Sequence, residues 1–90
     1  MEKEKVYQAI DTELDYQKSL EGNANRPDVL KDFHIGDALT AIDYNLNQAK
    51  LVWYYDSEPY TKTLDLLRKI AALIVKQGMK HGMPDRVVKS

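Results

Sequence analysis

Ninety residues, 43% of them hydrophobic, suffice for one small domain, which buries only about 60–65% of the surface that the unfolded chain exposes. The 13 basic and 14 acidic side chains give a formal net charge of −1, which argues against a protein that coats nucleic acid, because such a protein would be strongly basic. The lack of cysteine excludes disulfides and thiolate metal sites.

The first predicted helix covers residues 2–20, where apolar side chains recur every four positions from Val6 to Leu14. The charged start MEKEK leads directly into this periodic pattern and does not resemble a signal peptide. No apolar run in the chain approaches the roughly 18 residues of a membrane span. We therefore expect a soluble, cytoplasmic protein without membrane or nucleic-acid partners. Gly22 should end the helix, and residues 22–29 (GNANRPDV) are typical of a loop.

The second predicted helix begins near Asp32 or His34 and ends at Tyr55. Asp32 suits the N-cap, and Asp37 suits the positively polarised first turn. Spacings of three and four residues separate the apolar positions Ile35, Leu39, Ile42, Leu46, Ala49 and Trp53. This pattern predicts the seam of a helix bundle.

The third predicted helix covers residues 59–80, with Ser57 or Glu58 as its cap and Pro59 in its first position. It carries two neighbouring apolar stripes, one of Leu64, Leu67, Ala71 and Ile74 and the other of Leu66, Ile70 and Leu73. An apolar arc this wide contacts neighbours on two sides, which three helices of one chain cannot easily cover. We therefore predict an all-α, three-helix chain that assembles into an oligomeric helical bundle, either a dimer or a tetramer.

Gly82 and Pro84 should stop the third helix, because glycine accepts the conformation of a helix end and proline cannot continue a helix. The predicted organisation is therefore a single helical domain over residues 1–86 with a loose tail over residues 87–90.

Three sequence segments occur in an order that resembles a known family: IDTELDYQ, FHIGDALTAIDYNLNQA and LRKIAALIVKQGMKHGMPDR. Over residues 6–86 the chain is similar to small phage and bacterial MazG-like proteins, relatives of the all-α nucleotide pyrophosphohydrolases. The resemblance implies an oligomeric bundle that binds nucleotides between helices, in the host cytoplasm if a phage encodes it. Active members of that superfamily hold magnesium with a Glu-Glu-x-x-Glu element and a later Glu-x-x-Asp element.

The carboxylates of this chain depart from that family pattern. Asp37 and Asp43 fall on different faces of the second helix, the third helix offers Asp65 alone, and Asp11 and Asp15 share one face of the first. Magnesium requires several hard oxygen ligands in near-octahedral arrangement. We therefore expect no catalytic residue, no metal site and no cofactor, while a nucleotide-shaped pocket could persist.

Candidate contacts to a small nucleotide-type ligand are Tyr16, Gln17, Lys31, His34, Asn47, Arg68 and Arg86. Gln17 could bond a base or ribose edge, whereas Tyr16 could equally pack its ring and leave its hydroxyl in water. Lys31 and His34 could reach a phosphate at the start of the second helix, or His34 could simply cap it.

The other candidates also have two interpretations. The amides at Asn45, Asn47 and Gln48 suit either an interface between helices or a ligand. Arg68 lies in the middle of the third predicted helix, where it could hold a phosphate or pair with a carboxylate of another helix. Arg86 follows the rigid turn at Pro84 and could lie over a neighbouring subunit's pocket.

Four aromatic residues, Trp53, Tyr54, Tyr55 and Tyr60, surround one turn and could seal the end of the core or stack on a purine.

The preferred functional hypothesis is sequestration of a nucleotide-type ligand without efficient turnover, for example by a phage protein that binds a signal made by host defence. Sequestration requires a matching pocket and does not require transition-state stabilisation. One alternative is a magnesium-dependent pyrophosphohydrolase whose carboxylates, Asp11, Glu13, Asp15 and Asp37, come from different subunits. Another is a helical module that docks a protein.

Overall fold

The computed structural model describes residues 1–21 and 34–87. It contains three helices, α1 (Lys3–Glu21), α2 (Ile35–Tyr55) and α3 (Pro59–His81), and no strand among the described residues. The predicted all-helical, three-helix architecture is confirmed, with boundaries that differ by at most one residue when His34 is taken as the predicted start of the second helix. Lys31 and Asp32 lie outside the described residues.

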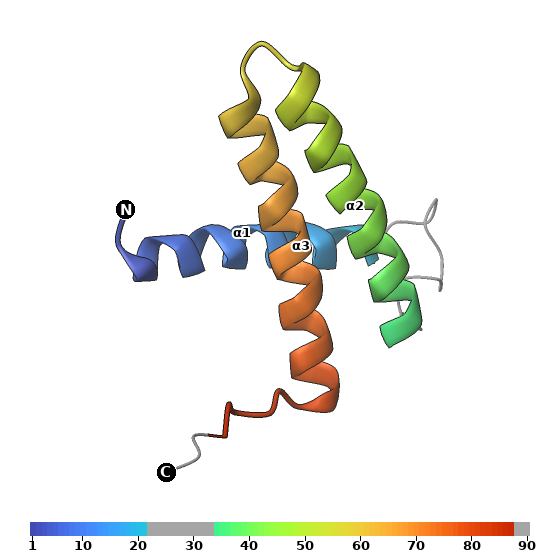
Figure 1. The fold of residues 1–90 in the computed structure, drawn as a ribbon. Coiled ribbons are helices and arrows are strands. Elements are labelled where there is room, and N and C mark those ends of the chain that lie inside the picture. Colours follow the sequence, from blue (N-terminus) through green and yellow to red (C-terminus); the bar gives the residue numbers. More distant parts are fainter. Residues whose placement is uncertain (22–33, 88–90) are drawn as a thin grey trace.

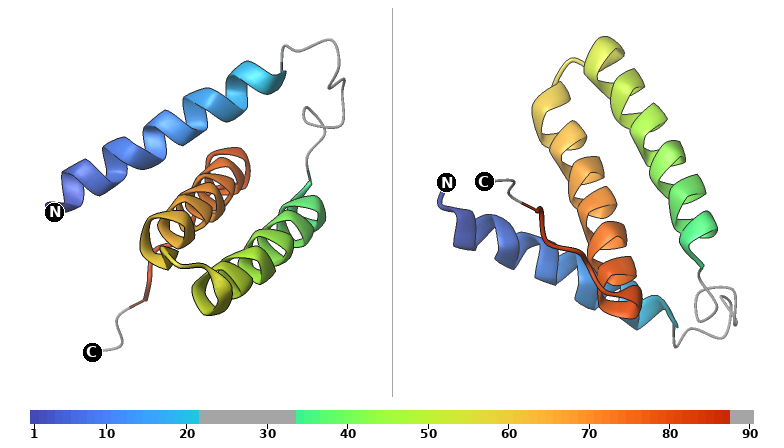
Figure 2. Two further views of the ribbon diagram at one scale, coloured as in Figure 1. Left: turned by 90° about the horizontal axis from the view of Figure 1, so that it is seen from above. Right: turned by 60° about the horizontal axis from the view of Figure 1, so that its bottom comes forward.

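Helix α3 is the centre of the arrangement. Helices α2 and α3 pack side by side as an antiparallel hairpin, and α1 crosses α3 on the side away from α2 (Figures 1 and 2). Over the described residues, α1 and α2 make no close backbone approach to each other. The chain therefore holds together through α3, which has one neighbour on each of two sides.

Local signals account for the start of α2. His34 occupies the N-cap with an extended backbone (φ −80°, ψ 166°), and its N–H donates to Asp37 Oδ2 at 3.1 Å. Of the two predicted starting positions, the structure uses His34. Asp37 lies in the first turn, where its charge complements the helix dipole as predicted.

The turn between α2 and α3 is organised by Asp56. Its backbone N–H donates to Val52 O at 3.0 Å, its Oδ1 accepts the Glu58 N–H at 2.9 Å, and its Oδ2 accepts Lys62 Nζ at 2.8 Å. Glu58 is the N-cap of α3 and Pro59 occupies its first turn, as predicted. Together these contacts fix the direction in which α3 leaves the turn.

The pKa of Asp56 is held below its ordinary value of 3.8 by the hydrogen bond from Lys62 and then by that from the Glu58 N–H. This contribution to stability is therefore present above pH 3.8 and is lost as the pH falls through the lower, folded-state pKa. Replacing Lys62 with methionine is expected to raise the Asp56 pKa while leaving it below 3.8, because the Glu58 bond remains. A carboxyl NMR titration measures this, and an unchanged Asp56 curve would refute it.

The end of α3 depends on Gly82, which has φ +86° and ψ 144° and whose N–H donates to Gly78 O at 2.8 Å. Side-chain-bearing residues rarely adopt this backbone region. Gly82→Ala is therefore expected to destabilise the fold by about 1–3 kcal/mol. Gly36→Ala is the matched control: an added Cβ meets nothing within 4 Å at either glycine, but Gly36 lies inside a helix.

The control should change stability in the opposite direction, because alanine in a helix stabilises by about 0.4–1 kcal/mol relative to glycine. Urea unfolding of the two variants measures both effects. Equal changes for Gly82→Ala and Gly36→Ala would show that the backbone at Gly82 is not constrained.

The chain buries little apolar material. Among the described residues the buried apolar side chains are Ala38, Ala49 and Ala72, and no large side chain is fully buried. Helix α2 approaches α3 through Ala38, Ala49 and the half-buried Val52, which recur at helical spacing. Small residues at this contact let the two backbones approach closely, but they contribute little hydrophobic free energy.

The seam predicted for α2 is therefore not buried within one chain. Its members Ile35, Leu39, Leu46 and Trp53 are exposed, whereas Ala49 is buried. The predicted stripes of α3 also separate. Leu66, Ile70 and Leu73 are half-buried, while Leu64, Leu67 and Ile74 remain exposed.

Candidate functional site

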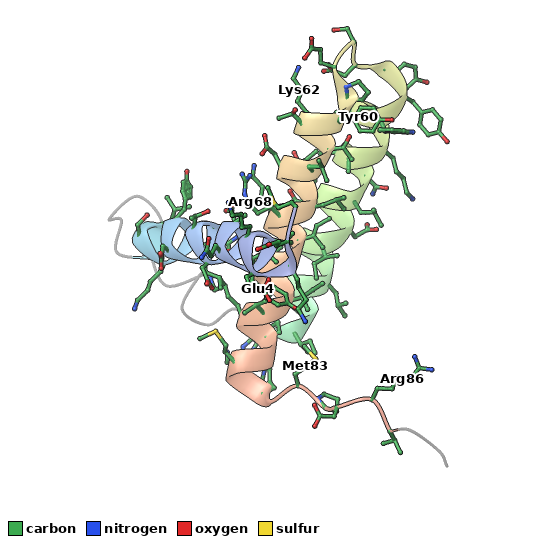
Figure 3. All side chains as sticks on the ribbon, turned by 90° about the vertical axis from the view of Figure 1, so that its left-hand side faces the viewer. Glu4, Tyr60, Lys62, Arg68, Met83 and Arg86 are labelled. Atoms are coloured by element: carbon green, nitrogen blue, oxygen red, sulfur yellow. The ribbon has the colours of Figure 1, made fainter. Side chains whose placement is uncertain are left out.

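A charged cluster around the buried Glu13 joins α1 to α3. Glu13 of α1 is only 8% exposed, and its Oε1 accepts Arg68 Nε at 3.1 Å. Arg68 Nη1 also donates to Asp65 Oδ1 at 2.7 Å, and Gln17 Nε2 lies 3.4 Å from Glu13 Oε2. These contacts place Arg68 at the crossing of the two helices (Figure 3).

The electrostatics of this cluster favour the charged form of Arg68. The pKa of Arg68 is raised above its ordinary value by its hydrogen bond to Asp65 and then by that to Glu13. Of the two interpretations open for Arg68, the structure shows the pairing with a carboxylate of another helix. With Glu13 and Asp65 ionised, the three groups sum to one negative charge, which disfavours an anion at this position.

An apolar groove of about 430 Å³ lies beside the cluster, between the first half of α1 and the first half of α3. Its apolar lining includes Val6, Ala9, Ile10, Leu64, Leu67 and Ala71, and the polar groups of Asp65 and Arg68 reach it. A concave apolar surface with a few polar groups is the usual setting of a small-molecule site.

The groove adjoins an exposed apolar surface on the α2/α3 hairpin, which we call the open hairpin face. Helix α2 contributes Ile35, Leu39, Leu46 and Trp53 to it. Helix α3 contributes Tyr60, Leu64, Leu67 and Ile74. These eight side chains are between 39% and 70% exposed.

The two helices present these residues on the same side of the hairpin. Within each helix the members recur at spacings that keep them on one stripe. The rings of Trp53 and Tyr60 meet edge to face, with centroids 5.0 Å apart and an interplanar angle of 89°. Because Trp53 belongs to the α2 stripe and Tyr60 to the α3 stripe, this contact joins the two stripes into one surface.

The structure brings together two of the residues predicted to bind ligand, Gln17 and Arg68, through their shared contact with Glu13. Tyr16 and Asn47 are exposed on different helices, and His34 is exposed at the start of α2. Lys31 lies outside the described residues. Within one chain, the predicted residues that the structure describes therefore do not form one site.

Arg86 is exposed on the segment that follows α3, beyond Met83 and far from Arg68 (Figure 3). The aromatic residues of the turn do not seal a core within the chain, because Tyr54 and Tyr55 are 78% and 85% exposed. Asn45, one of the three amides of α2, donates to Ala41 O of its own helix at 2.8 Å.

Sequence reasoning missed the central position of Glu13. The residue lies three positions after Ile10 and four before Gln17, so it shares the inward side of α1. A carboxylate at an inward position requires a cation, and the mid-helix Arg68 supplies one. An acidic residue on the inward side of one helix and an arginine in the middle of another could therefore have predicted this ion pair.

Within residues 1–21 and 34–87, no three His, Asp or Glu side chains gather as a metal site would require. Across the same residues, no helix has both the length and the apolar character needed to cross a membrane. Comparisons with known protein families, curated proteins and solved structures found no match to this chain.

Proposed function

We propose that the chain forms a homo-oligomer, a dimer or tetramer, that binds a small nucleotide-type ligand between helices without turning it over. The observation that carries this proposal is the apolar groove of about 430 Å³ that opens beside the open hairpin face. A phage protein of this kind could sequester a nucleotide signal made by host defence, which is what the MazG-like resemblance suggests.

The exposed apolar side chains support self-association. Among the described residues, the buried apolar side chains are the three alanines Ala38, Ala49 and Ala72, whereas large ones such as Leu39, Tyr60 and Leu64 are 60% to 70% exposed. Large exposed apolar surfaces on a small domain are typical of sites where another molecule docks.

The groove suits the base of a nucleotide better than its phosphate. Arg68 uses two edges of its guanidinium on Glu13 and Asp65, which fixes the plane of the group while its side chain remains 34% exposed. A guanidinium plane can stack on a nucleobase, and apolar walls can enclose one. Phosphates would require basic groups outside the negative cluster, for which His34 or Arg86 of a neighbouring copy are the candidates.

Binding without turnover is supported by the ion pair between Glu13 and Arg68. Its carboxylate would serve as a magnesium ligand in the pyrophosphohydrolase alternative, yet it is buried against Arg68. A carboxylate that neutralises a guanidinium is a poor ligand for a second cation.

Isothermal titration calorimetry with cyclic dinucleotides, ADP-ribose derivatives and nucleoside triphosphates tests the proposal. We expect tight binding of at least one compound and no pyrophosphate release. Ala9→Leu, which fills the groove, should weaken that binding at least tenfold, whereas Tyr54→Ala, at an exposed ring away from the groove, should not. Native mass spectrometry of the purified protein counts subunits and detects a co-purified ligand.

Absence of binding across the panel would reject ligand sequestration. Release of pyrophosphate that stops on addition of a chelator would instead favour the hydrolase. A stoichiometric protein partner without small-molecule binding would favour an interaction module, which the exposed apolar surface could also serve.

A further inference from the structure

We infer that the open hairpin face docks against the same face of a second copy, so that two α2/α3 hairpins form a four-helix unit. This inference rests on the proposed self-association and names the surface that makes it. The occupant of the face is therefore another copy of this chain.

The exposed area of the face matches what such an interface needs. Its eight side chains average about half exposed, and with roughly 150–200 Å² for each large side chain they together present on the order of 600–850 Å². Stable interfaces of standard size bury about 800 Å² from each partner.

The chemistry of the face suits self-recognition. Its members are aliphatic or aromatic, so two copies can meet without bringing like charges together. Trp53 and Tyr60 lie at the turn end of the hairpin, whereas Ile35 and Ile74 lie toward the opposite end. In a two-fold arrangement the rings of one copy would meet the aliphatic end of the other, and Leu46 and Leu67 would lie near the axis.

The same docking would complete the groove. Leu64 and Leu67 belong both to the open hairpin face and to the groove lining. A second copy seated on the face would therefore form a further wall of the groove. This gives a physical reason for a ligand site that exists fully only in the assembly.

Cysteine cross-linking tests the face, because the natural chain contains no cysteine. Leu46→Cys and Leu67→Cys place a thiol near the expected axis. Tyr44→Cys is the matched control, since Tyr44 is also exposed but lies two positions before Leu46, about 200° around the helix. After mild oxidation, non-reducing gels should show at least tenfold more disulfide-linked dimer for one or both leucine variants than for the control.

The outcomes separate this inference from the proposed function. Light scattering that finds a monomer would overturn the docking, while calorimetry would still report on ligand binding. An oligomer in which Tyr44→Cys cross-links at least as well as both leucine variants would overturn the assigned face and leave self-association standing. Ligand binding would fail independently if the oligomer forms through this face but binds no compound of the panel.

Discussion

The double variant Leu46→Glu/Leu67→Glu is expected to dissociate the oligomer. Both side chains belong to the open hairpin face, so self-association would bury two carboxylates per copy without a cation. The effective cost of such burial is several kcal/mol per ion, and the leucine contacts are lost as well. We expect the dissociation constant to rise at least about 100-fold, which corresponds to about 2.8 kcal/mol.

Light scattering over a range of protein concentrations measures this change, and far-UV circular dichroism checks that the helices persist. Tyr44→Glu is the control, because it adds the same charge on the other side of α2. Leu46→Met/Leu67→Met is a second control that keeps the volume and apolar character of the face. A glutamate double variant that retains the wild-type mass at low concentration would contradict the prediction.

Replacing Arg68 with methionine is expected to destabilise the fold by about 2–3 kcal/mol. The change keeps much of the aliphatic stem but leaves the carboxylate of Glu13, 8% exposed, without its cation. The cost is put below the usual 3–5 kcal/mol for a broken buried pair because the Arg68 side chain is 34% exposed. Urea unfolding measures the difference.

Two further variants show whether Glu13 is the cause. The double variant Glu13→Gln/Arg68→Met should recover most of the lost stability, since a neutral amide costs less to bury than an unpaired carboxylate. Asp65→Asn should cost less than about 1 kcal/mol, because the Asp65 side chain is 48% exposed and its pair with Arg68 is screened by water. If Arg68→Met and Asp65→Asn lowered the free energy of unfolding equally, the burial of Glu13 would not be the main source of the stability that Arg68 contributes.

Helix boundaries were predictable because their causes are local in the chain. Pro59 fixes the first turn of α3, and Gly82 supplies the positive φ at its end. Asp37 accepts a hydrogen bond from the N–H of His34, only three residues earlier in the chain, at the start of α2. Each of these signals acts within one turn of helix, so the sequence around it is sufficient.

The candidate site was less predictable, because its contacts join distant parts of the chain. Arg68 and Glu13 are 55 residues apart, and the periodicity of each helix says which side is inward but not which helix lies there. The apolar stripes were predictable as stripes. That α2 would contact α3 through Ala38 and Ala49 and leave Leu39 exposed depends on how closely two backbones can approach, which spacing alone does not determine.

The attachment of α1 to α3 alone has a consequence for dynamics. Local opening proceeds most readily where few buried contacts hold an element, so we expect α1 to be the described helix that detaches at the lowest free energy. Because Val6 and Ile10 of α1 form one wall of the groove, the groove is lost whenever α1 detaches. Any molecule that fills the groove therefore slows the exchange of amide hydrogens in α1, and its apparent affinity is scaled by the fraction of chains in which α1 is docked.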